Sequence, residues 1–183
     1  MKAFSLNIDG KSITAPEGAT IFEAAKSGGI SIPGLCHLEQ LKPYGGCRLC
    51  MVEISKNGRK RLVASCAYPV QEGLEVQTNT EQIRKIRKTL IELLGPAAQQ
   101  YAAEYGAVAS RFRTQNLDCS LCGICVRYCN EVKKANALHF KGRGIDREIA
   151  LVPDAGMDCV YCQECVGYCT GGKLFSLIEA AYG

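Results

Sequence analysis

Tryptophan is absent from this chain of 183 residues, aromatic residues make up 7% of it, and only two histidines occur. This composition gives little support to a nucleic-acid platform, in which bases stack on aromatic rings. A glycine-rich dinucleotide-binding loop and a Ser/His/Asp set are also missing, so we expect no active site of the chain's own. His37 and His139 are expected to pack or to form hydrogen bonds.

Long apolar runs are missing as well. No segment approaches the roughly 18 consecutive apolar residues of a membrane-spanning helix. Residues 1–9 alternate apolar and polar side chains, whereas a secretory signal has a continuous apolar core. We therefore expect a soluble, cytoplasmic protein without membrane insertion, in which lasting disulfides are disfavoured.

Cysteine, in contrast, is abundant, with twelve in the chain. Such an excess indicates either a disulfide framework or metal ligands, and a cytoplasmic location favours metal ligands. The formal charge of +4 counts every thiol as neutral. Because an oxidised cluster with its four thiolates carries a charge of about −2, the basic balance is no argument for a nucleic-acid partner.

The main organisational signal is a tandem repeat of the pattern C-x2-C-x2-C-x3-C, which begins at Cys119 and again at Cys159. Three cysteines at this spacing can wrap one 4Fe-4S cubane, and in two-cluster ferredoxins the fourth cysteine of each run ligates the other cluster. The sequence therefore predicts two crossed ligand sets. They are Cys119, Cys122, Cys125 and Cys169 for the first cubane, and Cys159, Cys162, Cys165 and Cys129 for the second.

The remaining cysteines form an N-terminal set: Cys36, Cys47, Cys50 and Cys66. This set keeps the central CxxC of plant-type ferredoxins, with a single cysteine on either side, although the intervals differ. It predicts a 2Fe-2S cluster. The glycines at 45 and 46 leave the chain before Cys47 free of side chains, so backbone N–H groups could approach the cluster sulfurs.

Zinc is the alternative ligand for these sets, because CxxC pairs also bind zinc. Zinc sites usually have two such pairs separated by a longer spacer, which the doubled pattern fits poorly. A zinc-bound structural or nucleic-acid-binding module stays open as an alternative. Visible absorption would distinguish it, because zinc thiolates are colourless.

Hydrophobic periodicity predicts an α+β chain that begins with a β-hairpin over residues 1–15, turning at Asp9 and Gly10. A short helix is predicted over 20–26, and further strands over 50–54, 61–65 and 74–77. Together these elements predict a small mixed sheet covered by one helix.

A second helix is predicted after a capping box at residues 78–81, with apolar positions at 83, 86, 90 and 93. Its basic side chains at 84, 85, 87 and 88 are expected to face solvent. Residues 97–109 are also expected to be helical, 137–140 and 148–152 to be strands, and 174–178 to be a strand or a short helix.

The residues around the cysteines resemble a known iron-sulfur module. The resemblance is carried by IPGLC at 32–36, YGGCRLCMVE at 44–53, CGICVRYC at 122–129 and GRG at 142–144. Similar modules occur in the large iron-sulfur subunit of NADH dehydrogenase (complex I), in the diaphorase small subunit of NAD-linked hydrogenases, and at the front of multi-subunit iron-only hydrogenases. The resemblance implies a β-grasp 2Fe-2S ferredoxin-like domain at 1–79, a helical connector at 80–112, and a bacterial ferredoxin-like domain with two 4Fe-4S clusters at 113–183.

The resemblance also implies a partner subunit that binds FAD or FMN and NAD(P)H. We expect the chain to relay electrons between that flavoprotein and another redox subunit or a soluble ferredoxin. The expected setting is a cytosolic complex of the hydrogenase, formate dehydrogenase or electron-bifurcating transhydrogenase type. A free-standing multi-cluster ferredoxin stays open as an alternative.

The chain departs from those relatives in two respects. They usually carry a further cubane between the two domains, held by one histidine and three cysteines, but residues 80–118 contain neither residue type. The electron path between the domains must therefore differ or run through a partner. In addition, Asn130 and Thr170 stand where simple bacterial ferredoxins have proline after the fourth cysteine.

Overall fold

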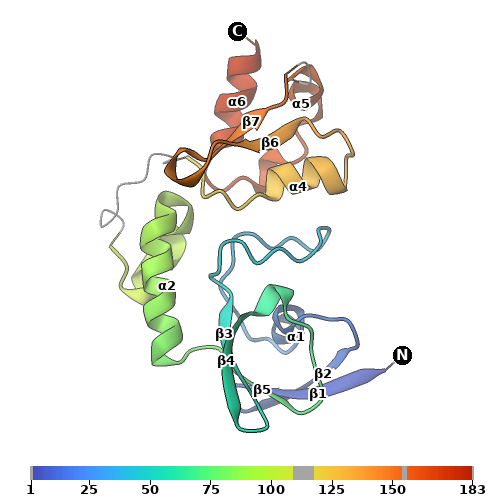
Figure 1. The fold of residues 1–183 in the computed structure, drawn as a ribbon, viewed down its shortest axis with the longest axis vertical. Helices are drawn as coiled ribbons and strands as arrows, with labels where there is room; N and C mark the ends of the chain where they lie inside the picture. Colours follow the sequence, from blue (N-terminus) through green and yellow to red (C-terminus); the bar gives the residue numbers. More distant parts are fainter. Residues whose placement is uncertain (1, 109–117, 154–155, 183) are drawn as a thin grey trace.

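The computed structural model describes residues 2–108, 118–153 and 156–182. The five-stranded sheet lies at one end of an elongated molecule, the module with the two cysteine repeats lies at the other, and the loop that carries the first three cysteines lies between them (Figure 1). In the part of the chain that the structure describes, no helix combines the length and apolarity needed to cross a bilayer.

The N-terminal half is built on a five-stranded mixed sheet in the order β2-β1-β5-β3-β4. Its strands are β1 (Ala3–Ile8), β2 (Lys11–Pro16), β3 (Met51–Lys56), β4 (Arg59–Ala64) and β5 (Leu74–Gln77). β1 and β5 run parallel, and the other neighbours are antiparallel. The predicted hairpin is confirmed: Asp9 and Gly10 both have positive φ, as the tight turn between β1 and β2 requires.

One helix, α1 (Ile21–Ser27), covers the sheet, as predicted. Thr20 caps it, and Glu23 completes a capping box by accepting from the backbone N–H of Thr20 over 2.7 Å. Ile21, Ala24 and Ala25 are buried against residues of the sheet in one hydrophobic cluster. The helix thereby fixes the start of the long loop that carries the first three cysteines.

The helix α2 (Glu81–Leu94) confirms the predicted helix, but two details of the prediction are wrong. Thr80 caps the helix by accepting from the N–H of Ile83, whereas Thr78 bonds to the carboxylate of Asp9. The buried positions include 83, 87 and 91, so Arg87 faces the interior rather than solvent. Arg87 is buried because it lies four residues from both Ile83 and Ile91, and positions four apart lie on the same face of a helix.

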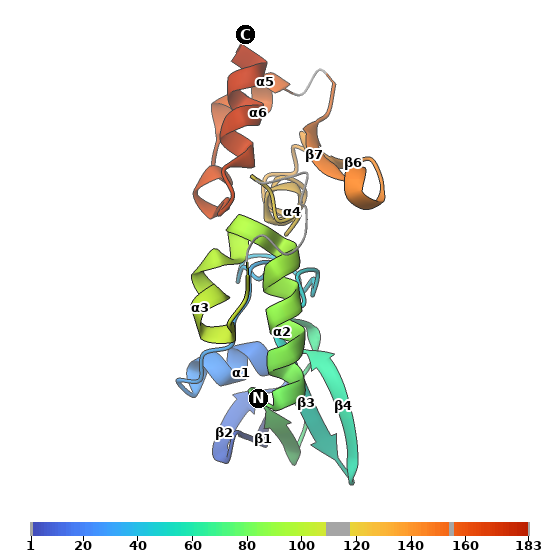
Figure 2. The same ribbon diagram turned by 90° about the vertical axis from the view of Figure 1, so that its left-hand side faces the viewer.

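The connector continues as η2, a 3₁₀ segment (Gly95–Tyr101), and α3 (Ala102–Tyr105). Gly106 has a left-handed conformation and ends α3, so this helical stretch is shorter and more broken than predicted. Figure 2 shows α3 beside α2. The predicted domain boundary at 112/113 lies outside the described residues.

The C-terminal module contains α4 (Ile124–Glu131), β6 (Leu138–Lys141), η3 (Gly144–Asp146), β7 (Glu148–Leu151), α5 (Gly156–Cys162), η4 (Val166–Tyr168) and α6 (Lys173–Tyr182). β6 and β7 form the predicted antiparallel pair. The segment predicted over 174–178 as a strand or a short helix is helical and belongs to α6. Helices and hairpin share one hydrophobic cluster, into which several cysteines pack.

Candidate metal centres

All twelve cysteines lie within the described residues, and each is a free thiol. The fold gathers them into three groups. One group lies beside the five-stranded sheet, and two line neighbouring cavities in the C-terminal module.

The N-terminal group is buried, with exposed fractions between 1% and 7%. Cys36, Cys47 and Cys50 lie on the loop between α1 and β3, and Cys66 lies in η1 (Ser65–Ala67), directly after β4. Because β3 pairs with β4, the residues that flank this hairpin meet, and the sulfurs of Cys50 and Cys66 lie 3.2 Å apart. A disulfide would need about 2.05 Å.

Hydrogen bonds between thiols dominate the electrostatics of this group. The pKa of Cys36 is lowered mainly by a hydrogen bond from the Cys47 thiol, and that of Cys50 mainly by one from the Cys66 thiol. The pKa values of Cys47 and Cys66 are raised in return. The hydrogen bonds therefore favour the thiolate form of Cys36 and Cys50 and the thiol form of Cys47 and Cys66, and a bound cationic centre would favour deprotonation of all four.

Backbone N–H groups approach the cysteine sulfurs of this group. The N–H of Cys47 donates to the sulfur of Cys36 over 3.4 Å, and the N–H of Leu35 donates to the sulfur of Cys47 over 3.5 Å. Such donors stabilise the more negative, reduced form of a cluster and tune its potential.

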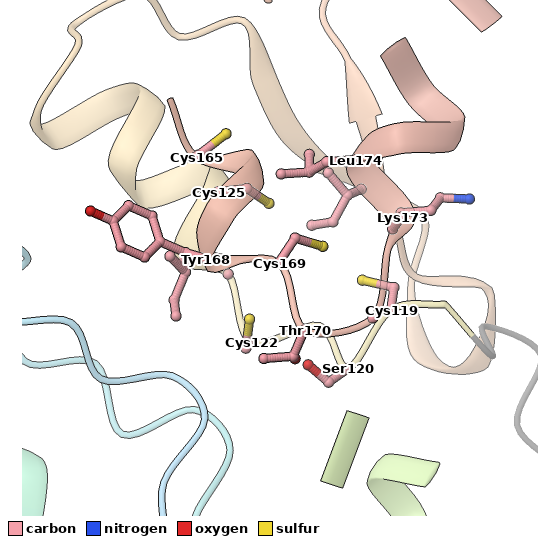
Figure 3. A pocket seen from close by; sticks show the side chains of 14 residues that line it. Cys119, Ser120, Cys122, Cys125, Cys165, Tyr168, Cys169, Thr170, Lys173 and Leu174 are labelled. Atoms are coloured by element: carbon pink, nitrogen blue, oxygen red, sulfur yellow. The ribbon is translucent and has the colours of Figure 1, made fainter. Parts of the chain in front are cut away.

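The first C-terminal cavity brings together cysteines from both repeats. Cys119, Cys122, Cys125 and Cys169 all line it. Figure 3 shows Cys119 and Cys169 approaching each other from two separate segments, while the sulfur of Cys165, another lining residue, points away. These four cysteines are the set predicted for the first cubane.

Cys129, Cys159, Cys162 and Cys165 line the second cavity. These are the cysteines predicted for the second cubane. Two short helices bring cysteines of both repeats to these cavities. α4 carries Cys125, which lines the first cavity, and Cys129, which lines the second, and η4 is flanked by Cys165, which lines both, and Cys169, which lines the first.

Burial opposes charge on these thiols. It raises the pKa of Cys119, Cys125, Cys159 and Cys165, the last to about 12. Neighbouring cysteines of the same predicted set add to the effect: Cys122 and Cys169 act on Cys119, and Cys129 and Cys162 act on Cys159. A bound cationic centre would compensate the charge of four thiolates in each cavity.

Sets of four sulfur ligands fit iron-sulfur clusters or zinc, whereas magnesium and calcium prefer oxygen. The chemistry of the donor sets therefore fits the predicted groups, although among the described residues no three of these side chains are placed around a common point as metal ligands would be. No histidine lines either C-terminal cavity, and the His37 ring packs on Phe22 with centroids 4.6 Å apart, in agreement with its predicted packing role.

Two polar residues that the cysteine pattern did not identify lie close to the cysteines. Ser65 is fully buried, between Ala64 and Cys66 in the chain, and its hydroxyl makes no hydrogen bond within the described residues. Arg127 lies on α4 between Cys125 and Cys129 and reaches the carbonyl oxygen of Cys36. Ser65 adjoins Cys66 in the sequence and Arg127 lies between Cys125 and Cys129, and this closeness to predicted ligands could have identified both residues.

Comparison with known proteins agrees with the N-terminal assignment. Residues 1–81 match the family model of a 2Fe-2S iron-sulfur cluster binding domain. The chain is 34% identical to NADPH-Fe(3+) oxidoreductase subunit alpha of Geobacter sulfurreducens, over 76% of this chain and 20% of that protein. It is 30% identical to the mitochondrial NADH-ubiquinone oxidoreductase 78 kDa subunit of Candida albicans, over 79% of this chain and 24% of that protein. The chain thus spans about a fifth to a quarter of these curated relatives.

A solved structure of similar length matches more completely. A chain in the crystal structure of NAD+-reducing NiFe-hydrogenase in the H2-reduced state superposes with a TM-score of 0.70 and 33% sequence identity, over 83% of this chain and 76% of that one. The chain therefore belongs to the family of 2Fe-2S-domain iron-sulfur proteins that also includes the complex I 78 kDa subunit and NADPH-Fe(3+) oxidoreductase subunit alpha.

Proposed function

We propose that this chain is an electron-transfer subunit that holds one 2Fe-2S and two 4Fe-4S clusters. It relays electrons between a flavin- and NAD(P)H-binding partner and another redox subunit or a ferredoxin, in a cytoplasmic oxidoreductase complex. When bound, the clusters supply one-electron redox chemistry. The observation that supports the proposal is that the twelve cysteines lie in one buried group and along two adjoining cavities.

The sites adjoin one another, which supports a relay. Cys122 packs against the hydrophobic cluster that contains Cys36 and Cys47, so the first cavity adjoins the 2Fe-2S site. Cys165 lines both C-terminal cavities. Cys162, in the second cavity, is exposed, and its neighbour Tyr161 has an exposed fraction of 78%. We propose this surface as the contact with the next redox protein.

The relatives support the nature of the donor, because they are oxidoreductases linked to NADPH, NADH or NAD+. We expect the tagged chain, isolated anaerobically from its own cells, to bring with it a flavoprotein through which NADH or NADPH bleaches the visible absorption of the clusters. Isolation as a stable monomer that reduces many acceptors would instead support the free-standing ferredoxin.

Gly171 provides a test of the first cubane site. A Cβ here would lie 2.2 Å from the carbonyl oxygen of Asp118, so the segment after Cys169 would have to move away from Cys119. Because overpacking costs about 1–3 kcal/mol, we expect Gly171→Ala to lose the first cubane roughly tenfold faster in anaerobic denaturant, measured from its EPR signal. Gly167→Ala is the matched control, since its Cβ would meet nothing within 4 Å. Equal rates for the two variants would contradict the proposed site.

Ser65 is expected to tune the 2Fe-2S potential. Its N–H donates to the carbonyl oxygen of Cys50, and its hydroxyl lies close enough to lower the pKa of the Cys50 thiol, although Cys66 contributes more. A hydrogen bond from this hydroxyl to the Cys50 sulfur that forms when the cluster is bound, and that strengthens by about 1 kcal/mol on reduction, corresponds to roughly 40 mV for a one-electron couple. We expect Ser65→Ala to lower the 2Fe-2S midpoint potential by about that amount in EPR-monitored titrations. The cubane potentials are the internal control, and an unchanged 2Fe-2S potential would contradict this role.

A further inference from the structure

The loop between Cys36 and Cys47 joins the two halves of the molecule. It lies directly below α4 in Figure 1, and the turned view in Figure 2 agrees. Leu41 is buried in the hydrophobic cluster of the C-terminal module, and Leu38 packs against that cluster. Leu35 and Cys36, in contrast, belong to the cluster beside α2. The loop that carries two predicted 2Fe-2S ligands is therefore also the contact with the module that holds the other two sites.

Arg127 fastens this loop to α4. Its Nη1 donates to the carbonyl oxygen of Cys36 over 3.2 Å, and its Nη2 donates to the carbonyl oxygen of Lys42. The guanidinium also lies over the Tyr44 ring, 4.8 Å from its centroid. The side chain has an exposed fraction of only 12%, so these interactions are largely shielded from water. Arg127 thus contacts the loop at Cys36, Lys42 and Tyr44.

Glu131, one helical turn after Arg127, completes the attachment. Its Oε2 accepts from the backbone N–H of Lys42 over 2.9 Å, while Oε1 lies 3.4 Å from Nε of Arg127. The carboxylate therefore orients the guanidinium and binds the same loop. Because Arg donates through a rigid planar fork, it can serve two carbonyls and a carboxylate at once, which the single ammonium of Lys cannot.

Arg127 lies close to a proposed ligand of each of the three clusters. It lies two residues from Cys125, in the first cavity, and two from Cys129, in the second. Its acceptor carbonyl belongs to Cys36, in the N-terminal set. The connector at 80–118 has no histidine or cysteine that could hold an intervening cluster. Transfer between the halves therefore depends on how closely this loop and α4 are held together.

We propose that Arg127 is a positioning residue, which sets the separation between the 2Fe-2S site and the first cubane site by fastening the 36–47 loop to α4. The inference rests on the proposed function. It predicts that Arg127 governs the rate of electron transfer between the two halves without contributing a ligand to any cluster.

The test compares Arg127→Gln and Arg127→Lys in the full cluster-loaded chain. Pulsed EPR measures the magnetic coupling between the reduced 2Fe-2S cluster and the first cubane, and rapid photoreduction followed by freeze-quench EPR measures the transfer rate between them. Arg127→Lys keeps the charge but lacks the fork, so we expect both variants to retain their iron, to show a weaker and broader coupling, and to transfer electrons about tenfold more slowly. Arg143→Gln, which removes an exposed arginine from the same module, is the control.

Unchanged coupling and rate in Arg127→Gln would overturn the inference. Normal values in Arg127→Lys alone would overturn it too, because charge rather than attachment would then be responsible. Loss of clusters from both variants would assign Arg127 to assembly instead of spacing. A wild-type chain with clusters but no transfer between the halves would contradict the proposed function itself, so the two failures are distinguishable.

Discussion

Replacement of Cys169 by alanine is expected to remove the first cubane, about four of ten iron atoms per chain, and to leave the 2Fe-2S signal intact. Cys169 is the fourth cysteine of the second repeat but lines the cavity of Cys119, Cys122 and Cys125. A cubane that loses one of its four thiolates has one iron without a protein ligand. Iron analysis and low-temperature EPR of the dithionite-reduced protein measure the loss.

Two matched variants decide whether the ligand sets cross. With crossed sets, Cys169→Ala and Cys119→Ala abolish the same EPR signal, whereas Cys159→Ala abolishes the other. With each repeat serving its own cluster, Cys169→Ala would match Cys159→Ala. That second result would overturn the proposed assignment, while leaving the number of clusters unchanged.

Replacement of Arg87 by methionine is expected to destabilise the first cysteine site by about 2–4 kcal/mol. The buried guanidinium donates to the carbonyl oxygens of Leu49 and Met51, over 3.0 Å and 2.9 Å, and to the hydroxyl of Tyr105 over 3.0 Å. Methionine retains most of the apolar stem but leaves these acceptors unsatisfied on either side of Cys50. We expect the 2Fe-2S absorption to be lost at a markedly lower denaturant concentration under anaerobic conditions.

Arg84→Met is the matched control for this effect. Arg84 lies on the same helix and over the same Tyr105 ring, with 5.2 Å to its centroid, but it is exposed. Because hydrogen bonds at the surface are exchanged for bonds to water, its loss should cost under about 1 kcal/mol. Equal shifts for the two variants would contradict the role of Arg87 in supporting the Cys50 loop.

Cysteine spacing predicted most of the candidate sites, because a cluster imposes a short, fixed separation on its ligands. The structure places the predicted sets in one buried group and two cavities. Strands and helices were predicted where periodicity and caps were clear, as in the hairpin at Asp9 and Gly10 and the helix capped by Thr20. Whether these cavities hold iron-sulfur cubanes stays a prediction.

Tertiary contacts account for what the sequence did not predict. Arg87 belongs to a basic run on α2, and a run of charges indicates a solvated face unless a partner for one of them is known. Its partners are carbonyls 38 and 36 residues away in the chain, which no local pattern identifies. Leu41 was equally unpredictable, since its burial depends on a module that begins about eighty residues later.

The central claim is that three four-thiolate sets hold iron-sulfur clusters, and metal analysis tests it most directly. The anaerobically purified chain is expected to contain about ten iron and ten acid-labile sulfide, and dithionite reduction should give one 2Fe-2S EPR signal and two magnetically interacting cubane signals. About two or three zinc per chain, without sulfide, visible absorption or an EPR signal, would contradict the electron-transfer function and leave a zinc-stabilised module.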